Sequence, residues 1–255
     1  MHTFVIAEIG SAWRFGDGQT QIENAREAIR AAHVSGADAI KFQWTSDHRR
    51  MEKRRSVSNG SYYILSWPEE WIEHFATYCT SHNLEFMCTV FLQCDVLVLN
   101  SYVKRWKVAS LECEDEKLLD AIEASGKPVI ISSGAMGFAM IPPLLNASIL
   151  HCTAAYPAPL DQLNLRAVKC HSGYSDHSCN VLTGAIAVAC GSSMVEVHFR
   201  LDDTPPDNPD YGHSLTPSQL KTYIENIRQT ELMLGDGVKK VEKCEEWALK
   251  HKVIA

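Results

Sequence analysis

The chain has 255 residues, of which 45% are hydrophobic and 22% are charged, values typical of a globular protein. A formal net charge of −7 argues against a protein that holds nucleic acid through a basic surface. The nine cysteines form no CxxC pair, and neither a signal-peptide pattern nor an apolar run long enough to span a membrane occurs. We therefore expect reduced thiols and a cytoplasmic protein that binds neither nucleic acid nor membrane.

Short apolar segments alternate with longer amphipathic ones along the chain. In chain order, the apolar segments predict strands at residues 4–9, 37–43, 84–91, 104–110, 128–132, 148–152, 173–175 and 194–199. The amphipathic segments predict helices at residues 21–35, 68–81, 115–125, 181–190 and 217–234. Strands that alternate with helices in this way are typical of parallel βαβ units.

This alternation is compatible with two architectures. A length of about 250 residues is ordinary for one (β/α)₈ barrel. An open doubly wound sheet would usually carry a glycine-rich turn after its first strand. The first strand instead runs into Glu8-Ile9-Gly10 without a GxGxxG motif. We therefore predict an α/β protein with one (β/α)₈ (TIM) barrel, a single domain over residues 1–255.

Some segments depart from a regular barrel. The connection between the strands at 128–132 and 148–152 contains Pro142 and Pro143, so any helix there must be short. The connection between residues 164 and 173 is also brief, which predicts a second shortened crossover. The basic cluster at 49–55 is expected in a loop. The charged tail at 239–255 is expected to form a helix that lies on the barrel.

Polar residues gather at the predicted carboxyl ends of the strands, where this fold forms its active site. They are Glu8, Lys41, Gln43, Thr89, Lys107, Ser110, Ser132, Ser133, His151, Ser175, His177, Glu196 and His198. Lys41 and Lys107 each lie within an apolar run, where burial of an unpaired ammonium group is costly. The two lysines favour a shared anion site over two unrelated surface lysines.

His177 and His198 lie at the ends of consecutive predicted strands, so their rings can meet. Two imidazoles suit zinc, manganese, iron or cobalt and leave positions open for water and substrate. From the residues alone, a metal site and a pair of satisfied core histidines are equally good interpretations. Asp176 and Glu196 are candidates for orienting the two rings.

Nine segments in series carry a family resemblance. They are IAEIG (6–10), GADAIKFQ (36–43), KVASLE (107–112), GKPVIISSGAM (126–136), LHCTAAYPAP (150–159), NLRAV (164–168), GYSDHS (173–178), VEVHF (195–199) and LGDGVKK (234–240). In these segments the chain resembles the sialic acid (N-acetylneuraminate) synthase family. Its members condense phosphoenolpyruvate with an amino sugar such as N-acetylmannosamine. The resemblance implies a transferase that forms a carbon–carbon bond, giving a nonulosonic or related 3-deoxy acid and phosphate.

The resemblance also implies roles for the matching residues. His177 and His198 match metal-binding histidines, and the metal is usually manganese, with magnesium or cobalt as alternatives. The residues that match groups around phosphoenolpyruvate are Lys41, Lys107, Thr89, Ser110, Ser132, Tyr156 and Ser175. Those that match residues facing the metal or the sugar are Glu8, Gln43, Glu112 and Asp210. Lys41, Lys107 and Glu112 are expected to be catalytic. The lysines would offset charge, and Glu112 would position water or move a proton.

The sequence departs from the family pattern on the sugar side. The first loop, usually Asn-His-x-Gly, is Ser11-Ala12-Trp13-Arg14. We expect no C-terminal antifreeze-like domain, which usually supplies a sugar-binding arginine. Arg14 or the loop at 45–61 is a candidate substitute. The implied partners are phosphoenolpyruvate and an aldose. The family commonly forms domain-swapped dimers, but the swapped domain is not expected here, so a homodimer stays open.

Two other functions stay open from the sequence. One is a metal-dependent aldolase or isomerase on the same barrel that does not use phosphoenolpyruvate, which the altered first loop allows. The other is a non-catalytic barrel that binds a sugar phosphate. Retention of both histidines and both lysines argues against this second alternative.

Overall fold

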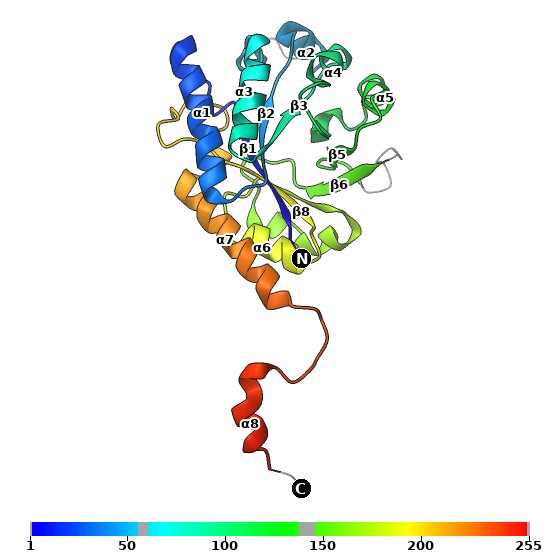
Figure 1. Cartoon of the computed structure of the whole chain (residues 1–255). Coiled ribbons are helices and arrows are strands. Elements are labelled where there is room, and N and C mark those ends of the chain that lie inside the picture. The colour runs from blue at the N-terminus through cyan, green and yellow to red at the C-terminus, as the bar shows by residue number, and fades with distance from the viewer. Residues whose placement is uncertain (1, 56–60, 138–145, 254–255) are drawn as a thin grey trace.

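A computed structural model describes residues 2–55, 61–137 and 146–253. Eight parallel strands, β1 to β8, close into a barrel in sequence order (Figure 1). Their bounds are β1 Phe4–Gly10, β2 Ala39–Gln43, β3 Glu85–Thr89, β4 Trp106–Val108, β5 Val129–Ser132, β6 Ala147–Cys152, β7 Gly173–Asp176 and β8 Met194–His198. All eight predicted strands are present, and the predicted (β/α)₈ barrel is confirmed.

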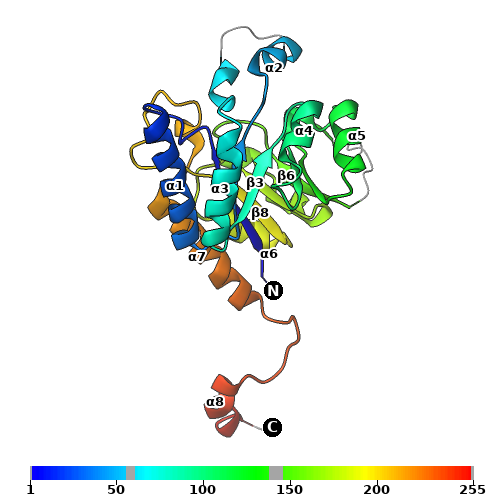
Figure 2. The same cartoon turned by 45° about the horizontal axis from the view of Figure 1, so that its top comes forward.

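Helices surround the strands on the outside (Figures 1 and 2). They are α1 Gly18–Ser35, α2 His48–Arg54, α3 Glu70–Ser81, α4 Gln93–Leu99, α5 Glu116–Ala124, α6 Thr183–Ala189 and α7 Pro217–Leu234. The predicted bounds of α7 are those observed, because Thr216 caps its first turn and Pro217 suits the first helical position. The sequence prediction missed α4, since seven residues are too few to show a helical period.

The irregular crossovers differ from one another. Between β6 and β7 the chain forms only the 3₁₀ turns η4 Leu160–Gln162 and η5 Leu165–Cys170, as the predicted short crossover requires. The prolines Pro142 and Pro143 lie outside the described residues. The basic cluster at 49–55 is mostly helix α2, so its assignment to a loop was wrong. The Asp47 side chain accepts a hydrogen bond from the Arg50 amide at 3.0 Å, and Met51 is buried under the helix.

The interior of the barrel has an apolar floor and a polar layer above it. The floor consists of Ile6, Ala39, Met87, Ile130, Leu150 and Met194. Two residues further along the same strands lie Glu8, Lys41, Thr89, Ser132, Cys152 and Glu196, all buried. Side chains two residues apart in a strand point to the same face. The floor therefore closes the barrel from below, and the polar layer faces its carboxyl end.

An aromatic cluster fixes the loop after β1. Trp13 is completely buried and meets Phe75 of α3 edge-on, with ring centroids 5.4 Å apart. It also packs against Phe42 and Trp67 at 5.8 and 5.5 Å, and its indole nitrogen donates to the carbonyl oxygen of Gly10 at 3.1 Å. Edge-on contacts between aromatic rings stabilise the fold beyond the burial of their surface. These contacts hold the first loop in one conformation beside the polar layer.

The tail does not lie on the barrel, and that expectation was wrong. Helix α8, Glu246–Lys250, follows a 3₁₀ turn and lies away from the barrel in both views (Figures 1 and 2). Trp247 is 71% exposed and Val253 is 91% exposed. Positive φ angles at Gly235 and Gly237 turn the chain out of α7. Within the described parts of the chain, none of the helices is long and apolar enough to cross a membrane.

Candidate functional site

Two buried lysines occupy the polar layer, as the sequence predicted. The ammonium group of Lys41 lies 2.6 Å from a carboxylate oxygen of Glu8 and donates to the hydroxyl of Thr89 at 2.7 Å. The ammonium group of Lys107 donates to the hydroxyl of Ser132 at 2.8 Å. Both lysine side chains are at most 3% exposed. The hydroxyls therefore fix where each positive charge points.

Glu196 supplies a carboxylate that both lysines share. Its two oxygens lie 3.3 Å from the nitrogen of Lys107 and 3.7 Å from that of Lys41. It also accepts a hydrogen bond from Ser175 at 3.0 Å. Burial alone would raise the pKa of Glu196, but the lysines outweigh burial and lower that pKa to about 2. Both ammonium groups therefore already have a carboxylate partner within the protein.

Glu8 is the second acid of the layer. It is completely buried, accepts a hydrogen bond from the Gln43 amide at 2.9 Å and pairs with Lys41. Burial raises the pKa of Glu8 to about 7, although Lys41 acts in the opposite direction. Glu8, Gln43, Lys41, Thr89, Lys107, Ser132 and Ser175 thus form one connected network with Glu196.

The predicted histidines lie beside this network, at the ends of β7 and β8. The ring centroids of His177 and His198 are 5.3 Å apart. The Nδ1 atom of His177 lies 3.0 Å from the carbonyl oxygen of Thr153, to which it donates, so Nε2 carries the lone pair. Tyr156 covers His177 with its ring centroid at 4.2 Å. Burial lowers the pKa of both histidines, which favours the neutral form that binds metal.

A loop after β8 adds two further groups to His198. One potential ligand atom from each of His198, Asp210 and His213 lies within 4.8 Å of the other two. Asp210 was predicted from the resemblance, whereas His213 was not predicted at all. The spacing Asp-x-x-His, which places both side chains on one turn, is the signal that was available. His177 is not part of this compact group, although its ring contacts that of His198.

Asp210 is held in place by the first loop. Its Oδ2 atom accepts hydrogen bonds from the backbone amide of Ser11 at 2.5 Å and from the Ser11 hydroxyl at 2.7 Å. Gly10 permits this approach: its φ is +50°, and a Cβ atom there would lie 2.4 Å from the same oxygen. The first loop, which departs from the family pattern, therefore still reaches the metal side of the site.

The remaining predicted residues lie apart from the network. The Ser110 hydroxyl accepts from the amide of Gly134 at 3.1 Å and donates to the Cys152 sulfur at 3.5 Å. Tyr156 is 53% exposed above the histidines. Glu112 lies in an outer pocket and is not bonded to either lysine in the described structure.

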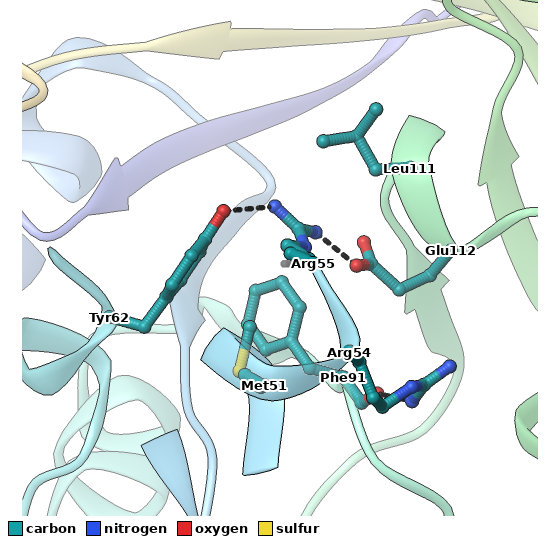
Figure 3. Close-up of a pocket in the computed structure, with 7 residues that line it drawn as sticks. All are labelled: Met51, Arg54, Arg55, Tyr62, Phe91, Leu111 and Glu112. Carbon is teal, nitrogen blue, oxygen red and sulfur yellow. Dashed lines mark hydrogen bonds and ion pairs between the residues drawn. The ribbon is translucent and has the colours of Figure 1, made fainter. Parts of the chain in front are cut away.

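The outer pocket has a volume of about 380 Å³ (Figure 3). Its lining residues are Met51, Arg54, Arg55, Tyr62, Phe91, Leu111 and Glu112. Arg55 forms an ion pair with Glu112 and donates to the hydroxyl of Tyr62 at 2.6 Å, as Figure 3 shows. Burial raises the pKa of Glu112, although Arg55 beside it acts in the opposite direction. The sequence prediction missed Arg55, which directly follows α2 and is one of several arginines in the basic cluster at 49–55.

The sequence profile of the NeuB family matches residues 28–239. The chain is similar to the N,N'-diacetyllegionaminic acid synthase of Legionella pneumophila, with 31% identity over 94% of this chain and 75% of that protein. It is also 31% identical to a pseudaminic acid synthase of Campylobacter jejuni, over 99% of this chain and 80% of the relative. These relatives are named synthases, which confirms the prediction of an enzyme of this class.

The fold is also shared with solved structures. An N-acetylneuraminic acid synthetase from Leptospira borgpetersenii superposes with a TM-score of 0.84, over 98% of this chain and 91% of that one. At 24% identity, this likeness establishes the fold alone. The sequence match over most of the chain confirms the resemblance seen in the nine motifs. The chain belongs to the NeuB family.

Proposed function

We propose that this protein condenses phosphoenolpyruvate with an aldose, an N-acetylmannosamine-like amino sugar or a smaller aldehyde. The products are a nonulosonic-type 3-deoxy acid and phosphate, and the reaction depends on a divalent metal, with manganese as our first choice. Membership of a family whose relatives are named acid synthases supports the reaction class. The observation that carries the proposal is the pair of buried lysines at the carboxyl end of the barrel.

The lysines suit the two charged ends of phosphoenolpyruvate. Lys41 and Lys107 share Glu196, and their hydroxyl partners Thr89 and Ser132 orient them. Oriented ammonium groups in a site away from water stabilise charge on phosphate and carboxylate without further reorganisation. Ser175 ties Glu196 to the same layer, so all these groups are placed before the substrate arrives.

The histidine side of the site fits a metal ion. The Nδ1 atom of His198 is buried and has no hydrogen-bond partner among the described residues. One potential ligand atom of His198 lies within 4.8 Å of a carboxylate oxygen of Asp210. Nε2 of His177 carries a lone pair because Nδ1 is occupied by Thr153. These residues would hold the ion, and a bound ion would supply Lewis acidity toward the aldehyde oxygen.

The reaction requires a new carbon–carbon bond, the addition of water and the loss of phosphate. C3 of phosphoenolpyruvate bonds to the aldehyde carbon, and the aldehyde oxygen takes up a proton to become a hydroxyl. The oxygen of water bonds to C2 and the water gives up a proton. The C2–O bond to phosphate then breaks, which leaves C2 as a ketone and releases phosphate. The buried lysines offset the negative charge of phosphoenolpyruvate and of the departing phosphate. Glu112 is our candidate for positioning water or moving a proton, because its buried carboxyl has a raised pKa. For this role Glu112 must leave Arg55 or share it with the substrate.

The outer pocket suits a neutral acceptor. Arg55 is paired with Glu112 and Arg54 with Asp115. Phe91, Met51 and Leu111 provide apolar walls, which match an acyl group better than a phosphate. We therefore expect an unphosphorylated sugar to be preferred over its phosphate ester.

The test is phosphate release from phosphoenolpyruvate with Mn²⁺, across a panel of aldoses that includes N-acetylmannosamine and its 6-phosphate. We expect release that depends on an aldose and is faster with the unphosphorylated sugar. Lys107→Met should abolish binding of phosphoenolpyruvate, whereas Lys104→Met, which alters an exposed lysine nearby in the sequence, should not.

Three results would contradict the proposal in different ways. Binding of phosphoenolpyruvate without release for any aldose would favour a non-catalytic barrel. Cleavage or isomerisation of a sugar without phosphoenolpyruvate would favour an aldolase or isomerase. A His177→Ala protein that binds metal as well as the parent would remove His177 from the metal site.

A further inference from the structure

His213 is the one histidine of the metal side that the family motifs do not include. It closes the 3₁₀ turn η6, Tyr211–His213, and is 8% exposed. Its ring centroid lies 4.8 Å from that of His198 and 5.0 Å from that of Tyr156. The loop after β8 therefore brings a third imidazole to the end of the barrel, next to the two predicted ones.

Two ring nitrogens of this group are available to bind a metal ion. Nδ1 of His198 and Nε2 of His213 are buried and form no hydrogen bond with the described residues. Nε2 of His213 nevertheless lies 3.1 Å from Oδ1 of Asp210, which is within ion-pair distance. Buried polar atoms are nearly always hydrogen-bonded, and a bound ion is one of the few partners that can take the place of a hydrogen bond.

The spacing of the group suits one ion. Protein donors lie about 2.0–2.2 Å from a first-row divalent metal, so two donors of one ion are at most about 4.4 Å apart. The candidate atoms of His198, Asp210 and His213 are all within 4.8 Å of one another, and a small inward movement would close the difference. Asp210 is already fixed by Ser11, so the movement needed falls on the two rings.

We propose that His213 is a direct ligand of the divalent metal, together with His198 and Asp210. This inference rests on the proposed metal dependence and adds a residue to it. Three imidazoles, counting His177, and one carboxylate would leave two positions of an octahedral ion for water and substrate. Manganese prefers oxygen ligands, whereas imidazole nitrogen also binds other transition metals well. With an imidazole at position 213, the site therefore also suits cobalt or zinc.

The alternative is that His213 only orients Asp210, and two substitutions separate these roles. Metal-free protein is titrated with Mn²⁺ and Co²⁺ by calorimetry, without phosphoenolpyruvate. Losing a group that only supports a metal ligand typically weakens metal binding by about 10- to 100-fold. We expect His213→Ala to weaken the binding of both ions by at least this much. His213→Gln keeps an N–H donor for Asp210 but not the imidazole, so it should stay as weak as His213→Ala.

The matched control is His151→Ala. His151 is also a partly buried barrel histidine, and one of its ring nitrogens is satisfied by the carbonyl oxygen of Leu163 at 2.7 Å. This variant should bind both ions like the parent. Circular dichroism and thermal unfolding of the metal-free proteins show whether each variant is folded, so that weak binding is not confused with misfolding.

A spectroscopic test reports the contact directly. His213→Cys loaded with Co²⁺ should gain a thiolate-to-cobalt charge-transfer band in the near ultraviolet, which the parent and a His151→Cys control lack. The proposal is overturned if that band is absent, if His213→Gln restores parental affinity, or if the parent binds neither ion. Because no step uses phosphoenolpyruvate, a protein that binds metal through His213 but releases no phosphate would overturn only the proposed synthase function.

Discussion

At the residue scale, the barrel mouth depends on the balance between two buried lysines and two buried glutamates. The protein can bury the charges of Lys41 and Lys107 because both lysines pair with Glu196, and Lys41 also pairs with Glu8. Breaking a buried pair usually costs more than the pair contributes, since an uncompensated charge remains. Glu196 is therefore the residue on which the electrostatics of the site depend most.

We predict that Glu196→Gln lowers the free energy of unfolding by about 3–5 kcal/mol, the usual cost of orphaning a buried charge. The glutamine can still accept from Ser175, but it no longer offsets the two ammonium groups. Denaturant unfolding at neutral pH measures the change. The control is Glu85→Gln, which breaks the more exposed pair with Arg105 and should cost only about 1 kcal/mol or less. Equal losses of stability in the two variants would show that Glu196 does not compensate the buried lysines more than an ordinary surface pair would.

At the scale of elements, the loop after β2 is tied to helix α4 by one carboxylate. Oδ1 of Asp95, in the first turn of α4, accepts from the backbone amide of Ser46 at 3.1 Å and from its hydroxyl at 2.5 Å. The other oxygen, Oδ2, is buried and has no hydrogen-bond partner among the described residues. Burial raises the pKa of Asp95 above its usual value of 3.8. Asp95 thus holds the outer-pocket side of the chain at an electrostatic cost.

From this raised pKa we predict how the stability of Asp95→Asn changes with pH. A carboxyl whose pKa is raised by folding contributes stability below its unfolded pKa and loses that contribution as the pH rises through the folded pKa. The asparagine has no such loss and can keep the bonds from Ser46. The stability of Asp95→Asn relative to the parent should therefore increase from pH 4 to pH 7. Unfolding curves across this range test it, with the exposed Asp120→Asn as control. A difference that does not change with pH would refute it.

At the scale of the whole molecule, the closed barrel and the tail are independent. The strands and helices from β1 to α7 form the packed body, whereas α8 stands clear of it (Figure 1). Val238, Val241 and Trp247 are more than half exposed. Residues that bury nothing against a core contribute little to its stability.

Removing residues 239–255 should therefore change the free energy of unfolding by no more than about 0.5 kcal/mol, the range typical of surface changes. Thermal and denaturant unfolding of the shortened and full chains measure this. A markedly lower midpoint for the shortened chain would show that the tail packs on the barrel, as the charge pattern first led us to expect.

The local sequence pattern predicts the barrel and most of its polar layer. The eight apolar segments, with Lys41, Thr89 and Glu196 near their carboxyl ends, are local patterns, and a closed parallel barrel brings all strand ends to one rim. His177 and His198 followed from the same rule, because β7 and β8 are neighbours. Local periodicity carries this information, so no long-range contact had to be known.

Which groups compensate these residues could be learned from the three-dimensional structure but not from local patterns. Asp210 meets Ser11 across 199 positions of sequence, and Arg55 meets Glu112 across 57. Such pairs depend on how loops return to the rim, and loops have no periodicity from which their course can be read. The same reason hid His213 in a turn after β8. The tail was predicted wrongly for a related reason. Its charge pattern predicts a helix but does not show whether that helix packs on the barrel.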